Sequence, residues 1–185
     1  MLNDVKAETE DRMKKAIEAL YRDLSAVRTG RASPTLVERV EIDYYGAMTP
    51  INQLAGISAP EARLLVIQPW DKGSIPAIEK AIRTADLGVN PTNDGDLIRI
   101  AIPALTEERR KEMVKVVRSK VEDSKVAIRN IRRDAISQVK ELAQEKMISE
   151  DDERRGEQEV QTITDKHIAQ AETIGKEKEE DVLEV

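Results

Sequence analysis

The sequence has no cysteine and no phenylalanine, and aromatic residues make up only 2% of its 185 positions. Without cysteine no disulfide or Cys-containing metal framework is possible, which fits a reducing intracellular compartment. No stretch approaches the ~18 consecutive apolar residues of a membrane span, and the first residues, MLNDVKAETEDRMKK, lack the apolar core of a signal peptide. We therefore expect a soluble, cytoplasmic protein whose core is built from aliphatic side chains.

Charged residues are abundant, at 36%, while hydrophobic residues reach 39%. This balance suits thin helical packing, in which each helix buries one apolar stripe. Residues 1–29 carry a stripe at alternating spacings of four and three, and a second stripe begins after Thr106 and continues for about 40 residues without a helix breaker. Ser149, followed by EDDE, predicts the N-cap of a last helix. Three such helices predict a three-helix bundle.

The middle of the chain changes to the two-residue period of strands. VEIDYYG, ARLLVIQPW and LIRIAIP predict strands, and residues 74–86 predict a short helix that stops near Gly88. The sequence thus predicts an α+β protein, in which residues 1–29 and 106–185 form an elongated three-helix bundle and residues 35–102 form an inserted β/α/β domain. The two crossings, 30–34 and 103–105, predict a two-stranded hinge, because they are rich in Gly or Pro; its residues are Thr29, Gly30, Pro34, Pro103 and Ala104.

The net charge of −6 is unevenly distributed. Residues 105–148 hold twelve bases and eight acids, whereas residues 149–185 hold five bases and thirteen acids. At 100° per residue, most cations of the long middle helix fall on one flank of its apolar stripe. These are Lys111, Arg118, Lys125, Arg129, Arg132 and Lys140, with Lys115 and Arg133 at the far edge.

Such a flank is often a solvated face that pairs with acids of neighbouring helices. The stretch IRNIRRDA, residues 128–135, nevertheless places three arginines within about one turn, where like charges repel unless a polyanion meets them. Arginine also matches the geometry of phosphate. Because no aromatic residue lies beside the cluster to stack bases, the pattern favours phosphate contacts with structured nucleic acid.

Other motifs are better explained by structure than by chemistry. His167, the single histidine, falls on the apolar stripe of the last helix, and we expect it to be packed there. NPTNDGD, residues 90–96, predicts a hairpin or helix–strand turn rather than a calcium loop. Trp70 is expected to pack at the end of a strand, and a partner-facing role is the alternative. Because no nucleophile–base pair or phosphate loop is found, we expect no active site, no metal and no cofactor.

Six collinear stretches resemble the bacterial ribosome recycling factor family, and the resemblance covers the whole chain. They are VRTGRASP (27–34), DYYGAMTPINQLA (43–55), AIEKAIRTADLGVNP (77–91), LTEERRKEMVK (105–115), VAIRNIRRDA (126–135) and ISEDDERR (148–155). The resemblance implies a monomeric translation factor, not an enzyme, that splits the post-termination 70S ribosome together with elongation factor G and GTP. It implies that the bundle binds the large subunit and that the inserted domain swings about the hinge.

Carried over by position, the resemblance assigns ribosomal RNA contacts to Arg28 and Arg31 near the hinge and to Arg129, Arg132 and Arg133 on the basic flank. Arg132 is the first choice, because it lies nearest the helix seam. Secondary candidates, for which an ordinary charged first turn is an almost equally good explanation, are Arg109, Arg110 and Lys111. The alternative function is a coiled-coil adaptor whose basic flank binds an acidic protein; a small hydrolase is disfavoured.

Overall fold

A computed structural model describes residues 1–184, which divide into two compact units. Met1–Arg28 and Glu107–Leu183 form the first, which we call the helical unit. Thr29–Thr106, together with Glu184, form the second, which we call the sheet unit.

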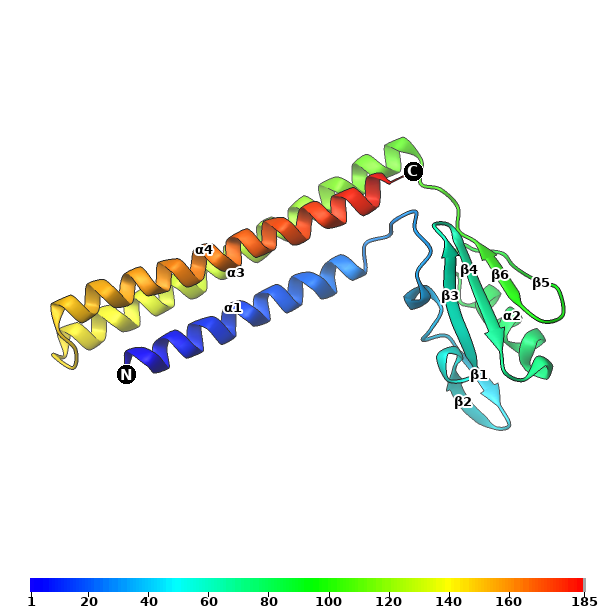
Figure 1. Cartoon of the computed structure of the whole chain (residues 1–185), viewed down its shortest axis with the longest axis horizontal. Coiled ribbons are helices and arrows are strands. Elements are labelled where there is room, and N and C mark those ends of the chain that lie inside the picture. Colours follow the sequence, from blue (N-terminus) through cyan, green and yellow to red (C-terminus); the bar gives the residue numbers. More distant parts are fainter. Residues whose placement is uncertain (185) are drawn as a thin grey trace. The chain divides into compact units, whose positions relative to one another are not determined.

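The helical unit is a bundle of three helices. They are α1, Leu2–Ser25, α3, Glu107–Gln144, and α4, Glu150–Leu183. All three pack on one another, and α3 runs antiparallel to both α1 and α4 (Figure 1). With 38 residues, α3 is about 57 Å long. The three-helix bundle predicted from the stripes is confirmed.

The core of the bundle follows the predicted stripes. Its larger cluster contains Met13, Ile17, Leu20, Leu24, Val117, Ile128, Ile131, Ala171, Ile174 and Val182. A smaller cluster contains Val5, Ala135, Val139 and Val160. His167 is 4% exposed, and its Nδ1 lies 2.7 Å from the carbonyl oxygen of Ile163, so the packed histidine is confirmed. At the start of α4 the backbone N–H of Asp152 donates to Ser149 Oγ at 3.0 Å, which confirms the predicted N-cap.

The sheet unit contains one α-helix, six strands and three short 3-10 helices. The helix is α2, Ile75–Thr84, and the strands are β1 Glu41–Tyr44, β2 Ala47–Pro50, β3 Ala55–Glu61, β4 Leu64–Pro69, β5 Pro91–Asn93 and β6 Ile98–Ala101. The 3-10 helices are Pro34–Leu36, Ile51–Gln53 and Lys72–Ser74. β1 and β2 form a hairpin, and the other strands form an antiparallel sheet in the order β3-β4-β6-β5. The structure thus has helices and a small inserted sheet, as the predicted class requires.

Three of the six strands were not predicted. β3 lies at the sheet edge, where its ladder with β4 is irregular between Ser58 and Glu61, and most of its residues are exposed. An exposed edge strand needs no alternating apolar pattern, and Pro60 falls within the irregular part. β2 and β5 are four and three residues long. Such strands are too short to carry a periodic signal.

One face of the larger sheet packs on α2. Ile78 and Ile82 of the helix and Leu65, Ile67 and Ile98 of the sheet are fully buried in one cluster. The helix ends at Thr84, four residues before the predicted stop at Gly88, and Asp86 already adopts a positive φ of 54°. The chain therefore leaves the helical conformation at Asp86 rather than at the glycine.

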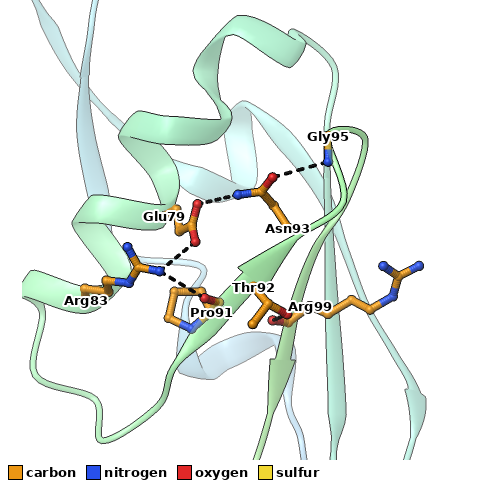
Figure 2. Close-up of polar contacts among 7 residues, drawn as sticks. All are labelled: Glu79, Arg83, Pro91, Thr92, Asn93, Gly95 and Arg99. Carbon is orange, nitrogen blue, oxygen red and sulfur yellow. Dashed lines mark hydrogen bonds and ion pairs between the residues drawn. The ribbon is translucent and has the colours of Figure 1, made fainter.

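Polar contacts fix α2 to the β5–β6 hairpin (Figure 2). Glu79 accepts hydrogen bonds from Arg83 at 2.8 Å and from Asn93 at 2.6 Å. In the turn that follows β5, Asp94 Oδ1 accepts the backbone N–H groups of Asp96 and Leu97. The hairpin interpretation of residues 90–96 is thus confirmed.

The expectation that Trp70 packs at the end of its strand is wrong. Its side chain is 72% exposed. Along β4 the buried positions are Leu65, Ile67 and Pro69, so the alternation of the strand places Trp70 on the opposite, exposed side.

Residues 1–184 offer no candidate for a membrane-spanning helix or for a metal-binding cluster. No helix there is both long enough and apolar enough to cross a membrane. Within the same residues, no three His, Asp or Glu side chains are grouped so that they could hold a metal ion.

Candidate nucleic-acid interface

A series of polar contacts spaced by seven residues connects α3 to α4. Arg118 Nε donates to Glu179 at 2.9 Å, and Lys125 Nζ donates to Glu172 at 2.7 Å. The Lys125 hydrogen bond, with the attraction of its charge, holds the pKa of Glu172 below its usual value. Two cations of the predicted basic flank are therefore engaged within the bundle, as the ordinary explanation of a charged flank requires.

Arg132 occupies the third position of this series but has a different kind of partner. Its Nη1 donates to the amide oxygen of Gln161 at 2.9 Å, and the Gln161 Nε2 donates to Asp165 at 2.8 Å. The side chain is half-buried, and its Nε is buried without a hydrogen-bond partner among residues 1–184. The guanidinium is thus held at the seam between two helices, while no carboxylate of residues 1–184 bonds to it directly.

The other two arginines of the cluster lie on the outer side of α3. Arg129 Nη1 is 3.4 Å from Glu122 Oε1, and with the side chains 49% and 60% exposed this ion pair is weak. Arg133 is exposed and makes no hydrogen bond or ion pair with any residue from 1 to 184. We call Arg129, Arg132 and Arg133 the arginine face.

The secondary candidates lie elsewhere on α3. Arg109 pairs with Glu112 at 2.7 Å, and Lys111 pairs with Glu107 at 3.6 Å. Arg110 is half-buried. At ~1.5 Å per residue, this first turn is about 30 Å along the axis from Arg129, so the structure does not bring these residues into the arginine face.

The two candidates near the crossings fall in different units. Arg28 is exposed at the end of the first segment of the helical unit. Arg31 belongs to the sheet unit, where its Nη2 lies 2.7 Å from Glu184 Oε2.

Sequence reasoning missed the α4 residues that face the basic flank. A signal for them was present, since Asp165, Glu172 and Glu179 repeat at seven residues, as do the cations opposite them. Two antiparallel helices with matching heptad spacing bring such positions together at every second turn. The amide of Gln161 has no counterpart in that pattern, and only the side-chain geometry reveals its role.

A face of this kind suits phosphate better than any reactive chemistry. Arginine presents planar, permanently charged donors that match phosphate oxygens. A cluster built on a rigid helix holds those donors at fixed spacing, so the arrangement can bind the backbone of a folded nucleic acid.

The chain is similar to proteins of one family along most or all of its length. The family model described as "Ribosome recycling factor" matches residues 20–183. Proteins named ribosome-recycling factor from Thermomicrobium roseum and Carboxydothermus hydrogenoformans are each 56% identical over 185 residues, which cover 100% of both chains.

Solved structures give the same result. The solution structure of a ribosome recycling factor matches with a TM-score of 0.78 and 43% identity, covering 100% of this chain and 98% of that one. A model of the Thermus thermophilus ribosome recycling factor with elongation factor G of Escherichia coli, bound to the E. coli post-termination complex, matches with a TM-score of 0.68 and 49% identity over both full chains. The chain belongs to the ribosome recycling factor family.

Proposed function

We propose that this chain releases ribosomes from mRNA after termination by splitting the post-termination 70S ribosome into subunits, together with elongation factor G and GTP. The helical unit binds large-subunit ribosomal RNA through the arginine face. The chain acts as a monomer in the cytoplasm and has no catalytic step of its own, because the GTP is consumed by its partner. A solved relative that is described with elongation factor G on a post-termination complex supports the choice of partners.

The observation that carries the proposal is the contrast between neighbouring cations on α3. Lys125 is bonded to a carboxylate of α4, whereas Arg133, about two turns away, has no partner within residues 1–184. Three arginines within five positions repel one another, which costs stability in the isolated protein. The phosphates of a bound RNA backbone would offset this repulsion between the arginines, so the cluster suits an RNA partner.

A mechanical role for the sheet unit is part of the proposal. The N–H of Ala32 donates to Ala62 at 2.7 Å, and the N–H of Ile102 donates to Arg63 at 2.8 Å. Both crossings are therefore attached to the β3–β4 turn by these two bonds, and Pro34 already begins a 3-10 helix of the sheet unit. The hinge is then confined to residues 28–31 and 103–106, where elongation factor G would act by moving the sheet unit.

The test is the affinity for purified large subunits as a function of salt. Replacing Arg133 by Ala removes one phosphate contact, so it should weaken binding and lower the salt slope by about 0.7–0.9. Lys125→Ala is the matched control, since it removes the same charge from the same flank at a position engaged by Glu172. An equal slope change for the two variants would contradict the assignment of the arginine face.

The adaptor alternative makes a different prediction in the same assay. An adaptor whose basic flank recognises an acidic protein would bind naked large-subunit RNA only weakly and non-specifically at physiological salt. Binding to that RNA with the same dependence on Arg133 would exclude the adaptor.

A further inference from the structure

The contacts between α3 and α4 follow a regular series with one irregular member. On α3 the donors are seven residues apart, at Arg118, Lys125 and Arg132, and the matching α4 positions are Glu179, Glu172 and Asp165. The first two pairs are direct ion pairs. In the third, the amide of Gln161 lies between the guanidinium and the carboxylate and bonds to both.

The amide between Arg132 and Asp165 leaves the charge of Arg132 available to a ligand. A direct carboxylate partner fixes a guanidinium but also compensates its charge, as at Lys125 and Glu172. A neutral amide fixes the guanidinium through its oxygen and leaves the charge uncompensated by that contact. Asp165 in turn orients the amide, because it accepts from the Gln161 Nε2 at 2.8 Å.

A second observation concerns the hydrogen bonds that Arg132 makes. The Nε of Arg132 is buried and has no hydrogen-bond partner among residues 1–184, while Nη1 donates to Gln161. Among residues 1–184, the guanidinium is thus attached to α4 through a single hydrogen bond. Without Gln161, the half-buried side chain would have to be ordered when the ligand binds, and ordering a long side chain lowers affinity.

We propose that Gln161, oriented by Asp165, is a positioning residue that holds the Arg132 guanidinium toward a phosphate of the bound RNA without neutralising it. The inference rests on the proposed function, because it needs Arg132 to meet phosphate. Both helices then contribute to RNA binding. Helix α3 carries the arginine, and α4 orients its guanidinium without compensating its charge.

Two substitutions separate orientation from charge. Gln161→Glu keeps the size of the side chain and creates a direct ion pair, so it should weaken large-subunit binding about tenfold and lower the salt slope by about 0.7–0.9, as loss of a charged phosphate contact does. Gln161→Ala frees Arg132 but leaves its charge, so it should weaken binding by a smaller factor with the slope unchanged. The matched control is Gln170→Glu, which adds the same charge to an exposed position of α4.

The decisive measurement is a double-mutant cycle with Arg132→Ala. If Gln161 acts through Arg132, neither Gln161 substitution changes affinity or slope further once Arg132 is Ala. A contribution of Gln161 to the bundle alone would persist in that background. In the free protein, the Arg132 side-chain NMR signal should show restricted motion that Gln161→Ala abolishes.

Wild-type affinity for Gln161→Glu, or an equal loss with and without Arg132, would overturn the inference. Unchanged binding by Arg132→Ala would overturn it as well, while ribosome splitting by the wild-type chain could still hold. Failure of the proposed function gives a different result, namely a folded wild-type chain that does not bind large subunits at all.

Discussion

Replacement of Gly175 by Ala should destabilise the helical unit, although alanine is the better helix former. Gly175 is buried in α4, and a Cβ built there would lie 2.5 Å from Cγ2 of Val121 on α3. Real Cβ atoms essentially never approach so closely, so one of the two helices or the valine must move. The valine has little freedom to do so, because a β-branched side chain in a helix has one strongly preferred χ1 rotamer.

Two opposing terms set the magnitude. Alanine is favoured over glycine inside a helix by about 0.8–1.0 kcal/mol. Overpacking a close contact costs about 1–3 kcal/mol. The expected result is a loss of about 1 kcal/mol from the free energy of unfolding. Gly156→Ala should cost less, because a Cβ there would meet a movable methyl of Leu2 at 3.0 Å and Cγ1 of Val139 only at 3.3 Å.

The assay is urea denaturation followed by far-UV circular dichroism at the helical signal, in two backgrounds. In Val121→Ala the obstructing methyl is gone, and the nearest remaining atom of residue 121 is its Cβ, at 3.6 Å. There Gly175→Ala should stabilise the helical unit by about 1 kcal/mol, the difference in helix propensity. The reasoning would be refuted if Gly175→Ala stabilised the unit equally in both backgrounds.

The remaining predictions concern the sheet unit and the hinge. The backbone N–H of Leu97, together with Arg99, holds the pKa of Asp94 well below its ordinary value of 3.8. Asp94→Ala should therefore lower the melting temperature at neutral pH. In thermal melts across pH, this difference between wild type and variant should persist above pH 3.8 and shrink below it. Trp70, the single tryptophan, should be quenched by iodide almost as readily as free tryptophan, and strong protection would contradict its exposed placement. Pro placed at Ala104 should leave large-subunit binding largely intact but impair splitting, because it stiffens one crossing; an equal loss of both would argue against a hinge there.

How much the sequence could predict depended on whether a feature is periodic. The bundle was predictable, because stripes such as Met13 to Leu24 repeat over many turns and demand burial. The edge strand β3 was not, because its exposed residues need no pattern. Trp70 was misassigned, because the alternation of β4 places it on the exposed side.

The candidate site, too, was predictable only in part from the sequence. Arg129, Arg132 and Arg133 fall within five neighbouring positions of one helix, so the sequence alone predicts that they cluster. Which cations are engaged by α4 depends on the register between two helices, and that register appears only when the side chains are in place. Gln161 illustrates the difference. Nothing in the sequence around this glutamine predicts a contact with Arg132, whose Nη1 lies 2.9 Å from the Gln161 amide oxygen in the structure.

The most direct test of the central claim is light scattering of post-termination 70S ribosomes mixed with this chain, a matched elongation factor G and GTP. We expect a drop in scattering that needs all the components and that is lost or strongly reduced with Arg132→Ala, because the arginine face holds the factor on the large subunit. No drop with a folded wild-type chain would contradict the proposed function. A full drop with Arg132→Ala would contradict the role of the arginine face.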